Sequence, residues 1–145
     1  MRLGAVMAAV LSFAIEGCAT DAGRVCRPGE LAATIETLYF GTGRKGADPV
    51  ASEEWREFMS QVVTPRFPQG LTWWKAQGQW RNDAGVIERE RAYVLQVVHP
   101  DAESVEPAIR DVAKRYREKF DQESVLRVSS PTCLSFLKST LGSHE

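Results

Sequence analysis

Residues 114–128, KRYREKFDQESVLRV, run from an amphipathic helix through a short polar turn into a strand. Tyr116 and Phe120 are four residues apart, which is the spacing of neighbours on one side of a helix. The turn is expected at residues 121–123, and the β-branched residues after it predict a strand over residues 124–129. A helix that leads directly into a strand indicates a fold that mixes both kinds of element.

Two helices are predicted from apolar residues at helical spacing. The helix that enters the turn is expected to begin near Ser104, with Pro107 in its first turn, where proline is tolerated. Its apolar stripe consists of Val105, Ile109, Val112, Ala113, Tyr116 and Phe120. An earlier helix is expected to be capped by Ser52 and stopped by Pro65. The apolar stripe of this helix consists of Trp55, Phe58, Met59, Val62 and Val63.

Three further segments have the composition of strands: residues 33–41, 71–81 and 86–98. The last two are separated by Asn-Asp-Ala-Gly, which is typical of a hairpin turn. Residues 92–98 are almost continuously apolar, which predicts a central strand covered on both faces. Gly78 interrupts the middle segment and predicts a bulge or a close backbone approach there.

The predicted order is strand, helix, strand, strand, helix, strand. This order predicts an α+β fold, the ferredoxin-like βαββαβ sandwich, with two helices on one face of a four-stranded antiparallel sheet. The opposite sheet face is then open. An aromatic open face is expected to bind a ligand, line a covered pocket or join two copies, because large exposed apolar patches are rare on soluble monomers.

The composition favours one globular domain. The chain has 145 residues, of which 43% are hydrophobic and 26% are charged. Its 18 basic and 19 acidic residues give a net charge of -1, so we expect no nucleic-acid partner. We expect a signal peptide at 1–17, a tether at 18–30, a single domain at 31–137 and a flexible tail at 138–145.

The beginning of the chain has the features of a leader for export. A basic residue at position 2 precedes an apolar run at 3–15, which is too short to span a bilayer. The run ends in a sequence similar to a lipobox, in which Cys18 would carry the lipid. Glu16 departs from that motif, and ordinary cleavage after Ala19 is the alternative. We therefore expect the cell envelope or periplasm, with a membrane anchor if Cys18 is acylated and secretion otherwise.

Apart from Cys18, the chain has two cysteines, Cys26 and Cys133, which lie at opposite ends of the expected domain. Disulfides persist in the oxidising compartments that exported proteins reach. We predict a disulfide between Cys26 and Cys133. Two buried, unpaired thiols are the alternative, because free cysteine is usually buried.

No motif for catalysis, metal binding or cofactor binding is predicted. Residues 41–46 read GTGRKG and match the dinucleotide pattern G-x-G-x-x-G, but the three residues that follow separate this loop from the helix that should bind the pyrophosphate. His99 and His144 are the only histidines, with no C-x-x-C or H-x-H spacing, so a zinc or iron site lacks ligands. Catalysis by a cysteine and a histidine would need a reduced cysteine, which export disfavours.

Arg127 is the most specific candidate for a site. Strand alternation places it opposite Leu126 and Val128, on the same sheet face as Val125 and Ser129. A guanidinium on the open face could pair with Glu123, Glu36 or an acidic ligand through two hydrogen bonds. Both a structural partner and a ligand remain open. In contrast, the basic residues of the preceding helix are expected to be solvated, because they form the i,i+4 pairs Glu106–Arg110, Asp111–Arg115 and Lys114–Glu118.

Three of the four tryptophans fall in one predicted strand, at positions 73, 74 and 80. Trp74 and Trp80 share a face if no bulge intervenes, and could stack on a sugar ring or form a dimer contact. The full set of candidate ligand or interface residues is Tyr39, Trp80, Arg81, Glu123 and Arg127.

Several separate blocks carry a family resemblance. They are ETLYFG at 36–41, Trp55, VTPRFPQGLT at 63–72, GQWR at 78–81, QESVLRV at 122–128 and SPTC at 130–133. With these blocks in order, most of residues 26–136 resembles the bacterial family catalogued as domain of unknown function 3574. The resemblance implies a signal or lipoprotein leader. It implies no catalytic residue, because that family has no established activity.

The sequence therefore favours an exported binding or interaction module that acts through its open sheet face. The expected partners are a second copy, a small ligand or an envelope component. The alternative is a small cofactor-independent enzyme of the kind built on dimeric ferredoxin-like barrels, with a pocket formed by Tyr39, Gln79, Arg81 and Arg127. A flat apolar face would favour assembly, and a closed cavity ringed by those side chains would favour the enzyme.

Overall fold

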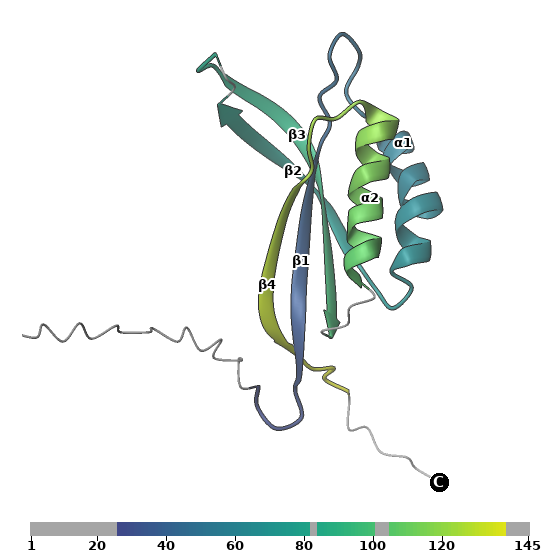
Figure 1. The fold of residues 1–145 in the computed structure, drawn as a ribbon, viewed down its shortest axis with the longest axis vertical. Helices are drawn as coiled ribbons and strands as arrows, with labels where there is room; N and C mark the ends of the chain where they lie inside the picture. Colours follow the sequence, from purple (N-terminus) through teal and green to yellow (C-terminus); the bar gives the residue numbers. More distant parts are fainter. Residues whose placement is uncertain (1–25, 82–83, 101–104, 139–145) are drawn as a thin grey trace, which may run out of the picture.

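The computed structural model describes residues 26–81, 84–100 and 105–138. The elements follow the order β1 (Leu31–Gly41), α1 (Ser52–Phe58), β2 (Thr72–Arg81), β3 (Ile87–Pro100), α2 (Val105–Phe120) and β4 (Leu126–Leu134). The strands form one antiparallel sheet in the order β2-β3-β1-β4. Both helices lie on the same side of this sheet (Figure 1). The predicted ferredoxin-like α+β sandwich is confirmed.

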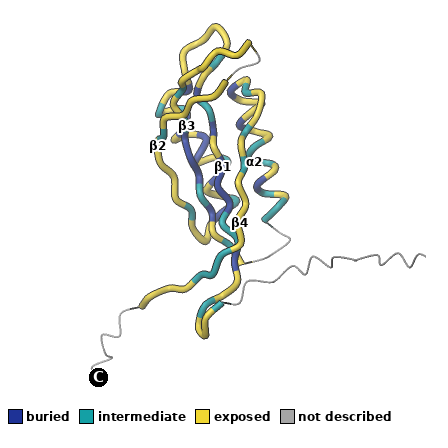
Figure 2. Tube along the Cα trace, turned by 90° about the vertical axis from the view of Figure 1, so that its left-hand side faces the viewer, coloured by how far each residue is buried: buried dark blue, intermediate teal, exposed yellow. Residues whose placement is uncertain are grey.

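The hydrophobic core fills the space between the sheet and the helices. Trp55 of α1 stacks on Tyr93 of β3, with ring centroids 4.4 Å apart, and packs at a tilt against Phe40 of β1. Tyr116 and Phe120 of α2 are both buried, as their spacing predicted. Figure 2 shows the burial concentrated in β1 and β3, which are the two central strands.

The first helix ends earlier than predicted and continues in two irregular turns. A π-helical turn spans Met59–Val63, and a 3₁₀ turn spans Thr64–Arg66. The apolar stripe is still buried at Met59 and Val63, so the change of helix type keeps these side chains in the core. The expected cap at Ser52 is wrong: Ala51 is the N-cap residue, and its backbone N–H donates to Glu54 Oε2 at 2.8 Å.

Two features of the strands differ from expectation. The register of β2 with β3 runs without an offset from Thr72–Gln96 to Arg81–Ile87, so the bulge considered at Gly78 is absent. Strand β4 continues past its predicted end at residue 129 to Leu134. It does so through Pro131, which an edge strand tolerates because one side of its backbone has no partner strand.

The predicted disulfide is confirmed. Cys26 and Cys133 are joined with a Cα–Cα distance of 5.6 Å across a sequence separation of 107 residues. The bond ties the segment before β1 to the end of the edge strand β4. The expected signal peptide at 1–17, Cys18 and all but the first residue of the expected tail lie outside the described residues, and so does the tether up to residue 25. Among the described residues, no helix has both the length and the apolar character needed to cross a membrane.

Candidate functional site

The sheet face opposite the helices is not covered by any described element (Figure 1). Residues paired directly across antiparallel strands share a face, and the registers place one row across all four strands. This row is Leu126, Tyr39, Val94 and Trp74. Its outer members Leu126 and Trp74 are 61% and 41% exposed, and of the two inner members Tyr39 is 37% and Val94 is 1% exposed.

The next rows of this face also lack charged side chains. They comprise Val128, Thr37, Gln96 and Thr72, then Ser130, Ile35 and Val98, then Thr132, Ala33 and Pro100. We call these rows, together with the row of Tyr39, the open face. A sheet face with no charge over all four strands can be removed from water without desolvating an ion.

The β2–β3 hairpin extends past the end of β1, because β1 stops at Gly41 opposite Ala92. We call the extension, residues 77–81 and 87–91, the arm. Its two sides differ: Trp80 and Glu88 pair on the side of the open face, whereas Gln79 and Arg89 pair on the side of the helices. In Figure 1 the arm leans away from the helices.

Two cavities of about 580 and 310 Å³ lie between the arm and the loop from Thr42 to Ser52. Both are lined by Thr42, Pro49 and Arg91, so we treat them as one feature, the arm groove. The larger cavity is lined by Thr42, Gly43, Pro49, Gln77, Gly78, Gln79, Arg89, Glu90 and Arg91. The smaller cavity adds Lys75, Ser52 and the ring of Tyr93 among its lining residues.

Backbone and side-chain hydrogen bonds hold the loop against β3. Thr42 donates to the carbonyl of Arg91 twice, from N at 3.0 Å and from Oγ1 at 2.8 Å. Gly43 N donates to Glu90 Oε2 at 3.1 Å. A Cβ added at Gly41 would lie 2.9 Å from the same carboxylate oxygen, so the glycine leaves room for the close approach of Glu90.

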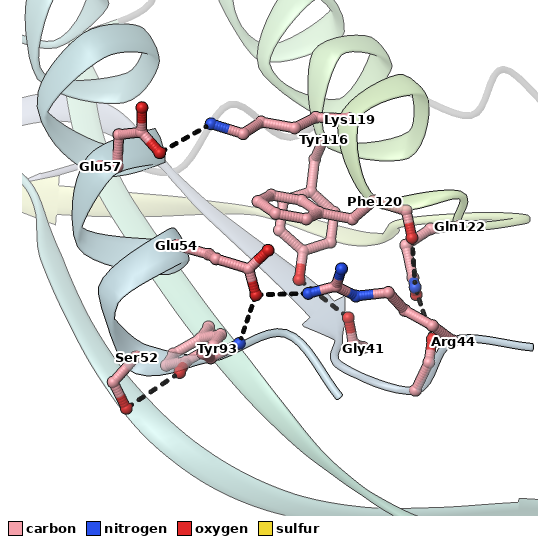
Figure 3. A network of polar contacts seen from close by, with 12 residues as sticks. Gly41, Arg44, Ser52, Glu54, Glu57, Tyr93, Tyr116, Lys119, Phe120 and Gln122 are labelled. Atoms are coloured by element: carbon pink, nitrogen blue, oxygen red, sulfur yellow. Dashed lines mark hydrogen bonds and ion pairs between the residues drawn. The ribbon is translucent and has the colours of Figure 1, made fainter. Parts of the chain in front are cut away.

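Contacts with both helices fix the other side of this loop (Figure 3). Arg44 pairs with Glu54 of α1, and its guanidinium lies 5.5 Å from the ring centroid of Phe120 of α2. Gln122 Nε2 donates to the carbonyl of Gly43 at 2.6 Å. The loop is therefore a fixed wall of the arm groove and not a free connection.

A buried polar cluster lies elsewhere, between the sheet and the beginning of α2. Glu36 is 2% exposed and accepts two hydrogen bonds from Arg127, at 2.7 and 2.6 Å, and one from Ser129 Oγ at 2.9 Å. Arg127 Nη1 also lies 2.7 Å from Glu106 Oε2 of α2. His99 Nε2 is 4.0 Å from Glu36 Oε1. The cluster links β1, β4 and α2 through one guanidinium.

This geometry places Arg127 on the helix side of the sheet, because its register partner is the core residue Leu38. The sequence left open which sheet face carries Arg127, and Glu36, one of the partners considered, is the residue that it binds. The hydrogen bond from Arg127 holds the pKa of the Glu36 carboxyl below its usual range, although burial acts in the opposite direction. Arg127 likewise lowers the pKa of Glu106.

The lowered pKa of Glu36 predicts a loss of stability in acid. Because the folded-state pKa lies below the ordinary value of about 4.5, ionised Glu36 stabilises the fold above that pH, and the contribution is lost as pH falls through the folded value. We expect the free energy of unfolding, measured with urea from pH 7 to pH 3, to fall below about pH 5. A Glu36→Gln variant should show a shallower fall, and an unchanged slope would contradict this role for Glu36.

The remaining predicted residues are spread over separate surfaces. Tyr39 lies on the open face, and Trp80, which is 47% exposed, lies on the same side of the arm. Arg81 is on the helix side of the arm, opposite Ile87. Glu123 is exposed, and its Oε1 accepts from Lys45 Nζ at 2.7 Å.

The pocket expected from Tyr39, Gln79, Arg81 and Arg127 is consequently not formed, because Tyr39 faces away from the other three. The three predicted i,i+4 ion pairs of α2 are present. The basic residues of the arm groove were not predicted from the sequence. The signal for them was the alternation Glu-Arg-Glu-Arg at residues 88–91, since a period of two places both arginines on one strand face.

One group of potential metal ligands occurs among the described residues. Side-chain atoms of Cys26, Glu30 and Cys133 lie within 4.8 Å of one another. The two sulfurs are joined in a disulfide, so they are not the thiolates that bind metals. We assign no metal to this group.

These features define a small ferredoxin-like α+β protein with one uncovered sheet face and a polar groove beside a hairpin arm. Residues 35–136 match the family described as "Protein of unknown function (DUF3574)", and the chain belongs to this family. No curated protein matches the chain.

The fold also occurs among solved structures. A phage SAM lyase in complex with S-methyl-5'-thioadenosine is similar with a TM-score of 0.55 and 12% identity, over 72% of this chain and 90% of the lyase. A phage SAM lyase in the apo state is similar with a TM-score of 0.51 and 14% identity, over 77% of this chain and 94% of the lyase. At these identities the likeness concerns the fold.

Proposed function

We propose that this protein is a non-enzymatic interaction module of the cell envelope that pairs with a second copy of itself through the open face. The observation that carries the proposal is the uncharged, uncovered surface across all four strands. Exposed apolar patches of this kind mark interaction sites on soluble proteins. Tyr39 and Trp74 belong to the residue types that are enriched in protein interfaces.

The size of the open face suits a dimer. Two of its rows cross all four strands and two cross three strands. With strands about 4.8 Å apart and a rise of about 3.3 Å per residue, these four rows cover about 440 Å². Because side chains project from this flat outline, the accessible area is larger and approaches the roughly 800 Å² per partner of a standard interface. A twofold dimer places the same patch on both copies, so an uncharged face meets no like charge.

The envelope location rests on the leader pattern and is supported by the disulfide, which suits an oxidising extracellular or periplasmic compartment. Acylation of Cys18 would anchor the protein to a membrane. Cells fed a clickable fatty acid should then label the wild-type protein and leave a Cys18→Ala variant unlabelled. Absence of label on the wild type would refute the lipid anchor. Ordinary signal-peptide cleavage after Ala19 would then be the remaining proposal for the exported protein.

Introducing a charge into the open face should abolish self-association. In a twofold dimer, Val128→Glu would place a carboxylate in each half of the interface, where burial without a partner is costly. We expect the dissociation constant of the dimer to rise at least about a hundredfold. Sedimentation equilibrium across a concentration series measures the mass: the wild type should approach the dimer and the variant should remain a monomer.

Ile87→Glu is the matched control. Ile87 is 47% exposed and Val128 is 46% exposed, and both are β-branched strand residues, but Ile87 lies on the helix side of the arm. This variant should keep the mass of the wild type. A monomeric wild type, or equal dissociation of the two variants, would overturn the proposed interface.

A small-molecule enzyme is the second candidate, with the arm groove in place of the expected open-face pocket. Two observations favour it: the cavity of about 580 Å³ and the likeness of the fold to phage SAM lyase. Titration of the purified protein with SAM, followed by thermal shift and by chromatography of the products, tests it. If millimolar SAM causes no thermal shift and yields no product, SAM is rejected as the substrate.

A further inference from the structure

The helix side of the hairpin carries a ladder of polar side chains in the arm groove. Its cross-strand pairs are Lys75–Tyr93, Gln77–Arg91 and Gln79–Arg89. Arg89 and Arg91 are two residues apart in β3, so both guanidinium groups extend from the same face. The ladder thus presents three cations and two amides along one wall of a cavity.

The three cations have no acidic partner among the described residues. Within the described part of the chain, no carboxylate lies within ion-pair distance of Lys75, Arg89 or Arg91, and the Lys75 ammonium donates to Ser52 Oγ at 2.9 Å. The exposed cations of the helices are mostly paired. Examples are Arg56, Arg110, Lys114, Arg115 and Lys119. Lys75, Arg89 and Arg91 therefore line the arm groove with no ion pair to any described residue.

We propose that the arm groove binds a small molecule that carries oxyanion groups, phosphate or carboxylate, with Arg91 as the central contact. Arg91 lines both cavities, so a ligand that extends through the groove passes its side chain. Guanidinium groups bind such oxyanions through paired, charge-assisted hydrogen bonds. Arg89 contributes the second guanidinium in the larger cavity, and Lys75 contributes an ammonium in the smaller one.

The acidic residues at the groove do not cancel this charge. Glu90 and Asp48 oppose the three cations, which leaves the lining with a net positive charge. One oxygen of Glu90 already accepts a hydrogen bond from Gly43 N, and this bond holds the carboxylate against the loop. Because the wall from Thr42 to Ser52 is fixed by its contacts with β3, α1 and α2, the site needs little ordering on binding.

This inference does not depend on self-association. The basic ladder of the arm groove lies on the helix side of the hairpin, whereas the proposed interface lies on the opposite sheet face. It requires no reaction and no cofactor, so it stands whether or not the protein is an enzyme.

Calorimetric titration of the purified protein with inorganic pyrophosphate and, separately, with citrate tests the site at low ionic strength. We expect at least one of the two to bind with one site per chain, and the better of them identifies the oxyanion class. Arg91→Gln should weaken that binding at least about tenfold, because charge-assisted hydrogen bonds are lost. Arg89→Gln should also weaken that binding, and it replaces Arg91→Gln as the test if Arg91→Gln does not fold.

Arg117→Gln is the matched control. Arg117 is an exposed arginine of α2 that lines neither cavity, and its substitution changes the net charge by the same amount. The affinity of Arg117→Gln should stay within about twofold of the wild type, because salt screens the effect of a charge that does not touch the ligand. The proposal is overturned if neither probe binds, if Arg91→Gln and Arg89→Gln bind like the wild type, or if Arg117→Gln loses as much affinity as they do.

Discussion

Replacing Arg127 by alanine is expected to lower the free energy of unfolding by about 3 to 5 kcal/mol. The substitution removes both hydrogen bonds at 2.6 and 2.7 Å from Glu36, which is 2% exposed, and leaves its buried carboxylate without its hydrogen-bonded cation. It also frees Glu106 from its contact with β4. Urea denaturation at pH 7, followed by tryptophan fluorescence, measures the change.

Two further variants separate the ion pair from general effects of charge. Arg110 binds the same Glu106 but is exposed, so Arg110→Ala should cost no more than about 0.5 kcal/mol. The double variant Glu36→Leu/Arg127→Met removes both buried charges and should recover most of the stability lost in Arg127→Ala. A loss in Arg127→Ala as small as in Arg110→Ala would contradict the role of the cluster.

Removing the disulfide is expected to have an effect of similar size. The bond closes a loop with a sequence separation of 107 residues, and in the chain-entropy model such a loop stabilises the fold by about 4 to 5 kcal/mol. The double variant Cys26→Ser/Cys133→Ser avoids a free thiol and should lose about this amount. This is a large part of the 5 to 15 kcal/mol typical of a folded domain, so the variant should unfold at markedly lower urea.

Reduction provides the control for this second variant. Wild-type protein treated with dithiothreitol should unfold at the urea concentration of the double variant, and the reductant should not change the variant itself. The two serines replace sulfurs that are only partly buried, so their own packing cost is small. A double variant as stable as the oxidised wild type would show that the bond contributes little.

Much of the fold could be predicted because its signals are local. Apolar residues at helical spacing predicted α2 within a residue of its observed bounds, and the hairpin turn predicted the pairing of β2 with β3. The disulfide followed from the number and position of the cysteines. Strand β4 was predicted too short, because a proline ends most strands and only an edge position tolerates it.

The candidate sites were less predictable, because each depends on residues far apart in the sequence. Arg127 and Glu36 are separated by 91 residues, and Arg91 meets Thr42 across 49. The alternation around Arg127 correctly grouped it with Ser129, yet it did not reveal which sheet face they share. The arm groove was missed because its wall is a loop whose position is set by Arg44, Gln122 and Glu90 together.

The sequence by itself determined the order of the elements, the disulfide partners and the family of this protein. The tertiary structure alone decided that Arg127 points toward the helices, that the open face is uncharged and that Lys75, Arg89 and Arg91 line one groove beside the arm. The physical reason is that the alternation of side chains along a strand shows which residues share a sheet face, but it does not show which face the helices cover. Only the packing of α1 and α2 against one face distinguishes the covered side from the open one.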